Sequence, residues 1–141
     1  MFNNFRKRLS NEKGFTLVEL LAVIVILGII AAIAVPAIGN IIGDTKKEAH
    51  VSNAQSMIEA ARLAHTTDDP DLSSPYTLSE LVEQGYLDSM PGHPDSGSYD
   101  GETSTVTVTE NTSSGGITYS VSLNDGEGEV ASGEKGEVSA Q

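Results

Sequence analysis

Cysteine and tryptophan are both absent from the 141 residues, and the three phenylalanines all lie at the N-terminal end, the last of them being Phe15. A chain without cysteine has no disulfide, no thiol nucleophile and no thiolate metal ligand. Any core beyond Phe15 must therefore be built from aliphatic side chains, alanine and the four tyrosines.

Positive charge is scarce beyond the first 14 residues, although the formal net charge of the whole chain is −12. Four of the eight basic residues precede Gly14, whereas all but one of the 20 acids follow it. Nucleic-acid binding depends on Lys and Arg side chains that neutralise phosphates. We therefore expect no direct nucleic-acid binding by this chain.

One long apolar run dominates the sequence. Between Phe15 and Ile42 the single charged side chain is Glu19. A helix needs about 20 apolar residues to cross a bilayer, and basic residues precede the run, so we expect one membrane span with the N-terminus in the cytoplasm. From these features alone, a signal peptide cleaved near residues 32–34 and an uncleaved anchor both remain open.

The residues that open this run have a recognisable order. The segment KGFTLVE, from Lys13 to Glu19, resembles the processing site of type IV prepilins and the related pseudopilins. The resemblance covers roughly residues 6–65. It implies that a prepilin peptidase cuts between Gly14 and Phe15, that Phe15 becomes N-methylated, and that Glu19 and Pro36 correspond to the family's glutamate and helix proline.

The resemblance also implies a function. The mature chain would be a structural subunit of a type IV pilus-like filament, a homopolymer joined by other pilins and built by an assembly platform in the cytoplasmic membrane, then displayed at the cell surface. A pseudopilin of a type II secretion or DNA-uptake system is the first alternative. An anchored single-pass binding domain that never polymerises is the second.

Physical chemistry gives Glu19 a role of its own. A carboxylate within an apolar membrane segment is unfavourable by roughly 2.5–3.5 kcal/mol at mid-bilayer, so such groups tend to be paired and functional. We expect Glu19 to pair with the cationic amine of Phe15, and the resemblance implies the amine of a neighbouring subunit. An interfacial acid with no partner is the alternative.

The same helix is expected to weaken near its middle. Proline removes a helical hydrogen bond and kinks or breaks a helix, so Pro36 marks a bend. Gly39 and Gly43 weaken the same region, and their spacing also fits a small-residue helix-packing face.

The rest of the chain predicts an α+β fold that is pilin-like: a long N-terminal helix, transmembrane in its first half, packed on a small antiparallel sheet. Thr77 and Glu80 fit the capping box of a short second helix. The alternating segments 104–109 and 117–123 predict a hairpin, with a short third strand over 129–131. The expected divisions are a leader over 1–14, a transmembrane or filament-core half-helix over 15–43, an amphipathic half-helix over 44–66, a globular part over 67–131 and a flexible tail over 132–141.

No catalytic constellation is visible, so we expect no enzyme and no required cofactor. His50, His65 and His93 are scattered in the sequence, and we expect a solvated or helix-flanking role for His50 rather than metal binding. Clustered carboxylates leave calcium as a weak alternative. The candidate ligands form two groups: Asp95, Asp100 and Glu102; and Asp125 and Glu127, with Asn124 and Glu129 beside them.

Overall fold

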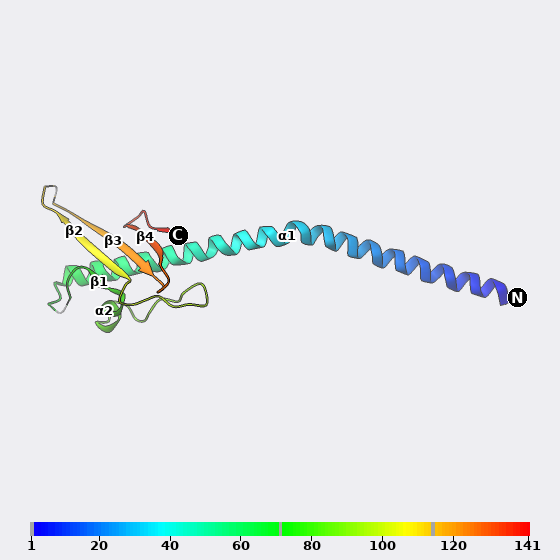
Figure 1. The fold of residues 1–141 in the computed structure, drawn as a ribbon, viewed down its shortest axis with the longest axis horizontal. Helices are drawn as coiled ribbons and strands as arrows, with labels where there is room; N and C mark the ends of the chain where they lie inside the picture. Colours follow the sequence, from blue (N-terminus) through cyan, green and yellow to red (C-terminus); the bar gives the residue numbers. More distant parts are fainter. Residues whose placement is uncertain (1, 71, 114) are drawn as a thin grey trace. The chain divides into compact units, whose positions relative to one another are not determined.

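The computed structural model describes the backbone of residues 2–70, 72–113 and 115–141, and the side chains of the same residues from Thr16 onward. The chain divides into two compact units, Met1–Ile42 and Gly43–Gln141. The first is helical. The second contains the remainder of that helix, a short helix and a sheet (Figure 1).

Helix α1 (Phe2–Thr67) runs without interruption through Pro36, Gly39 and Gly43. A proline leaves one backbone carbonyl without its helical donor but keeps a helical φ, so a helix can continue through it. The expected long helix is thus present, and it ends at Thr67, one residue beyond the expected boundary at residue 66. A bend at Pro36, Gly39 and Gly43 remains a prediction.

The sheet of the second unit has five antiparallel strands in the order β1-β2-β3-β4-β5. Sequence-adjacent strands are therefore neighbours throughout. The strands are β1 (Tyr76–Thr77), β2 (Thr105–Asn111), β3 (Gly116–Asn124), β4 (Glu129–Glu134) and β5 (Ser139–Ala140). The predicted hairpin and third strand are confirmed, and the sequence analysis did not identify the two short edge strands.

One buried cluster joins α1 to the sheet. In Figure 1 the strands run obliquely across the C-terminal part of α1. The helix contributes small side chains at spacings of three and four, which lets the sheet approach closely. The buried residues are Ala54, Met57, Ile58, Ala60, Ala61 and Ala64 from α1; Leu72, Tyr76, Leu78, Leu81 and Tyr99; and Val106, Tyr119, Val121, Leu123 and Ala131 from the strands.

Ile117 belongs to the alternating segment 117–123, yet it lies outside this cluster. Ile117 is 49% exposed because it pairs with Glu110 near the loop end of the β2–β3 hairpin. Figure 1 shows this end of β2 and β3 extending away from α1. The period-2 pattern of β3 is correct, but it continues past the point where the helix covers the sheet.

Helix α2 (Leu78–Glu83) begins where the sequence predicts. The Thr77 hydroxyl accepts the Glu80 N–H, and the Glu80 carboxylate accepts the Thr77 N–H at 2.9 Å, which completes the capping box. The helix ends at Glu83, and Gly85, whose φ is +79°, takes the left-handed position that follows its C-cap Gln84. The Leu87 N–H then donates to the Leu81 carbonyl.

The C-terminal residues differ from the expected flexible tail over 132–141. Strand β4 continues to Glu134, and β5 pairs with it through Ala131–Ala140 and Ser132–Ser139. The Gln141 N–H also donates to the Val130 carbonyl at 2.9 Å. The run of Gly, Ser and Glu looks mobile in sequence, but backbone pairing, which depends little on side chains, orders it.

Replacing Thr77 with alanine should destabilise the second unit by about 1 kcal/mol, because the α2 N-terminus loses its capping acceptor. Thr77→Ser keeps the hydroxyl and should restore most of that loss. The measurement is urea unfolding of the full chain in detergent, followed by tyrosine fluorescence, since all four tyrosines lie in this unit. Equal stability of the alanine and serine variants would contradict the capping role.

Gly133 tests the ordering of the C-terminus. Its φ is +148°, and an added Cβ would lie 2.6 Å from the Glu137 carbonyl oxygen and 2.9 Å from the Val138 Cα. Gly133→Ala should therefore cost about 1–3 kcal/mol in the same unfolding experiment. Gly128→Ala is the matched control because an added Cβ there meets nothing within 4 Å. A free tail would make the two variants equivalent.

Candidate functional site

The predicted processing site, Gly14 and Phe15, lies outside the residues whose side chains are described. Cleavage after Gly14 and methylation of Phe15 therefore remain predictions. Glu19 is described, and its side chain is exposed on α1 among apolar neighbours. Its pairing with a Phe15 amine also remains a prediction.

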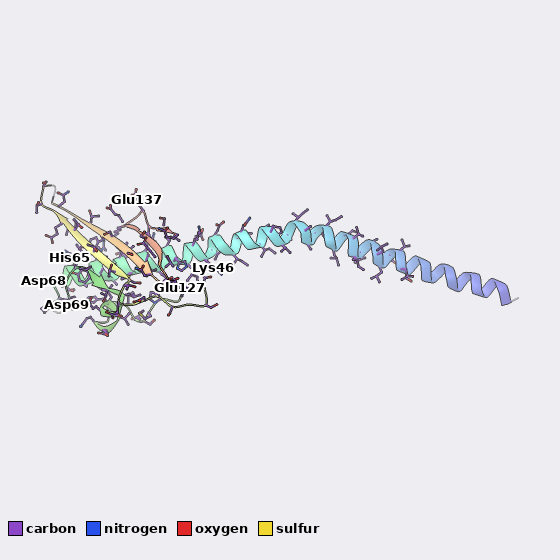
Figure 2. The ribbon with its side chains drawn as sticks, in the orientation of Figure 1. Lys46, His65, Asp68, Asp69, Glu127 and Glu137 are labelled. Carbon is purple, nitrogen blue, oxygen red and sulfur yellow. The ribbon has the colours of Figure 1, made fainter. Side chains whose placement is uncertain are left out.

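The apolar surface around Glu19 is the main feature of the first unit. Within the described residues, α1 is long and apolar enough to cross a membrane, and none of its most apolar window is buried. Its large hydrophobic side chains from Leu17 to Ile42 are between 49% and 72% exposed. Figure 2 shows these side chains projecting outward along the helix. A single chain thus leaves this surface without an apolar partner of its own.

Gly39 and Gly43 have no side chains, so they leave the helix backbone uncovered within that surface. A Cβ built on either glycine meets nothing within 4 Å, so the isolated chain gives no steric reason for glycine at these positions. A close-packed neighbouring helix would supply one. The described contacts do not test the predicted weakening of the helix at Pro36, Gly39 and Gly43.

The structure regroups the acidic residues proposed as calcium ligands. Asp95, Asp125 and Glu127 line one pocket of about 350 Å³, together with His93 and Gly97. Asp100 and Glu102 are not among the residues that line it. Instead, the Asp100 carboxylate accepts the N–H groups of Glu102 and Thr103 at 2.9 and 3.1 Å, which closes a turn.

Two of the grouped carboxylates already have partners. The Asp95 carboxylate accepts a hydrogen bond from Lys46 at 2.6 Å, and this contact lowers the pKa of Asp95. The Asp125 carboxylate accepts the N–H groups of Glu127 and Gly128, which lowers the pKa of Asp125. Both groups are ionised at neutral pH. Other acids, including Glu127 and Glu137, lie on the outside of the second unit (Figure 2).

His50 and His93 lie close together, which was not predicted from the sequence. The solvated position is wrong for His50, although it does lie on the helix, because its side chain is 8% exposed; the His93 side chain is 5% exposed. Their ring centroids lie 4.9 Å apart. His50 lies four residues before Ala54, so helical spacing could have placed it on the buried stripe. The sequence carries no comparable signal for His93, which reaches this position from a loop.

The surroundings of His50 favour the neutral form of its imidazole ring. Burial and the neighbouring His93 ring lower the pKa of His50 below its ordinary value. Burial also raises the pKa of Tyr99, whose hydroxyl lies 2.8 Å from His50 Nδ1. Near pH 7 the neutral His50 ring therefore lies beside a Tyr99 hydroxyl that keeps its proton.

Comparison with known proteins finds a family match in the N-terminal part of the chain. Residues 9–35 match the family described as "Prokaryotic N-terminal methylation motif". A type IV major fimbrial protein FimA from Dichelobacter nodosus is 40% identical over 65 residues, 46% of this chain and 39% of the relative. A fimbrial protein of the same organism is 38% identical over 66 residues, 47% of this chain and 40% of the relative.

The chain thus spans about two fifths of the length of these curated relatives. Among the solved structures, none matches it. The names of both relatives denote fimbrial proteins rather than enzymes. The chain carries the prepilin-type methylation motif and is a distant homologue of the type IV fimbrial proteins.

Proposed function

We propose that this protein is a structural subunit of a type IV pilus-like filament. A prepilin peptidase cleaves the precursor after Gly14, Phe15 is methylated, and an assembly platform in the membrane inserts the mature chain into the filament. The precursor spans the cytoplasmic membrane with its N-terminus inside, and the assembled subunit lies at the cell surface. Homopolymer contacts, joined by other pilins, involve the N-terminal helix.

The observation that supports this proposal most is the exposed apolar surface of residues 16–42. Each large aliphatic side chain contributes about 1.5–3 kcal/mol when it leaves water, and more than a dozen of them are exposed here. The sum is tens of kcal/mol, which exceeds the roughly 5–15 kcal/mol by which a domain is stable. Such a surface needs a continuous apolar environment. Lipid supplies it to the precursor, and neighbouring helices supply it in a filament.

Glu19 distinguishes a filament subunit from a plain anchor. An anchor gains nothing from a carboxylate in its span, and insertion becomes less favourable. In a filament of parallel helices, the carboxylate can meet the cationic N-terminal amine of another subunit. The pair would fix the axial register, because each subunit would offer one anion and one cation separated by one helical turn.

Glu19→Gln should abolish or strongly reduce filament yield while membrane insertion is retained, because the substitution removes the charge at nearly constant size. The measurement is electron microscopy of sheared surface fibres, together with immunoblotting of the membrane fraction. Glu48→Gln is the matched control, since Glu48 is an exposed acid of α1 in the second unit. Normal filament yield from Glu19→Gln would contradict the register role.

A further inference from the structure

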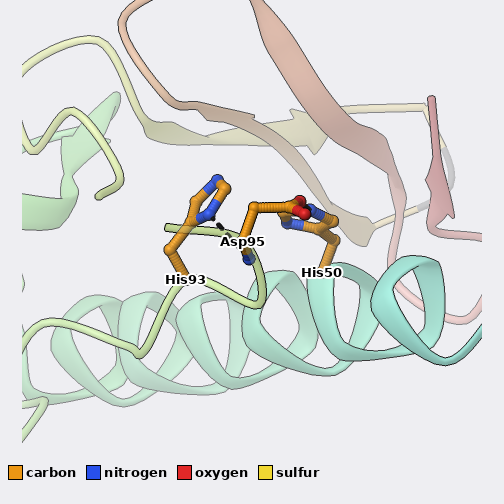
Figure 3. Close-up of side chains that lie close together, drawn as sticks. All are labelled: His50, His93 and Asp95. Carbon is orange, nitrogen blue, oxygen red and sulfur yellow. Dashed lines mark hydrogen bonds and ion pairs between the residues drawn. The ribbon is translucent and has the colours of Figure 1, made fainter. Parts of the chain in front are cut away.

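Three potential metal ligands converge on one side of the second unit. His50 extends from α1, and His93 and Asp95 come from the loop that follows α2 (Figure 3). One possible ligand atom from each residue lies within 4.8 Å of the other two. The loop and the helix are more than 40 residues apart in sequence, so the fold itself creates this group.

His93 has an unsatisfied polar atom at this place. Among the described residues, its Nε2 atom is buried and has no hydrogen-bond partner. The Asp125 carboxylate is the nearest charged group, at 4.0 Å, which is too far for a hydrogen bond. A buried imidazole nitrogen without a partner destabilises the fold. A bound cation would remove that penalty.

The surrounding groups suit a metal site as well. His50 Nδ1 lies 2.8 Å from the Tyr99 hydroxyl, so this contact can hold the Nδ1–H tautomer and leave Nε2 as the ligand atom. That Nε2 lies 3.7 Å from Asp95 Oδ2. Lys46 binds the other oxygen, Oδ1. One carboxylate oxygen is thus oriented by a neighbour while the second faces the histidines.

We propose that His50, His93 and Asp95 bind one divalent transition-metal ion of the zinc type. Two imidazoles and one carboxylate are a ligand set that zinc accepts, whereas calcium prefers oxygen ligands alone. Asp125, which lines the same pocket as His93 and Asp95, is placed to supply a fourth ligand or to accept a hydrogen bond from a bound water.

Binding requires a small local rearrangement. Ligand atoms around tetrahedral zinc lie roughly 3.3 Å apart, so the three side chains must close in from their separation of up to 4.8 Å. The Asp95 N–H donates to His93 Nδ1 at 3.1 Å. Coordination through Nε2 moves the ring proton to Nδ1 and opens this bond. The half-exposed loop at Asp95 can absorb the change.

A bound metal ion would cross-link the loop that carries His93 and Asp95 to helix α1. A link between residues 50 and 93 closes a long segment of chain, and such links reduce the freedom of the unfolded state. Metal binding would then stabilise the fold by mass action. This role is separate from polymerisation through the N-terminal helix, so either can fail without the other.

The test uses the full chain, purified in detergent and stripped with a chelator. Titration with Zn²⁺ should give one saturable site by calorimetry and should raise the midpoint of tyrosine-monitored thermal unfolding. Co²⁺ should give the absorption bands of a low-coordinate site. His50→Gln and His93→Gln should each weaken Zn²⁺ binding by at least about tenfold.

His65→Gln is the matched control. His65 lies on the same helix but faces Tyr76 and Glu110 instead, so this variant should bind Zn²⁺ as the parent chain does. Circular dichroism of the metal-free variants shows whether each substitution preserves the fold, and Asp95→Asn offers a third ligand change in the half-exposed loop. Absence of stoichiometric Zn²⁺ binding, equal binding by all the variants, or a response to Ca²⁺ alone would overturn the proposal.

Discussion

The exclusion of apolar surface from water is the interaction on which the rest of this molecule depends. Residues 16–42 form helix on their own, because helical hydrogen bonds are local, but their side chains find no cover within the unit they form. The free energy of exposing these side chains to water exceeds the free energy of unfolding of a small domain. The first unit therefore requires an external apolar environment, whereas the second unit buries its own core.

The second unit forms its buried core with few large side chains. It lacks Phe and Trp, and its helix contributes mainly alanines to the buried cluster. Alanine loses no side-chain entropy on burial and allows the sheet to approach closely. Tyr76 and Tyr119 supply volume from the strands. The absence of disulfides is compatible with this arrangement because backbone pairing extends through five strands.

Much of the fold could be predicted because its signals are local. The Thr77–Glu80 capping box and the alternation in β2 and β3 depend on neighbours in the sequence, and both were located correctly. The pairing of β5 with β4 could not be read in the same way, because edge strands of two residues leave no periodic signal. The meeting of His50 with His93 needed the tertiary path of the loop, which spacing along the chain does not encode.

The candidate assembly site can likewise be predicted only in part from the sequence. The order of Gly14, Phe15 and Glu19 is a local pattern, and these residues lie within the methylation-motif match over residues 9–35. What these residues contact in an assembly depends on other chains, so neither the sequence nor a single chain's structure contains it. The exposed apolar surface requires an apolar partner, and the partner we propose is the N-terminal helix of another subunit.

Mass spectrometry of the N-terminus of the surface-exposed protein tests the central claim most directly. A mature chain that begins at Phe15 and carries one added methyl group on its amine is the predicted result. A surface protein that retains Met1 and the residues up to Gly14 would contradict the account, because the cationic amine could not then lie one helical turn from Glu19.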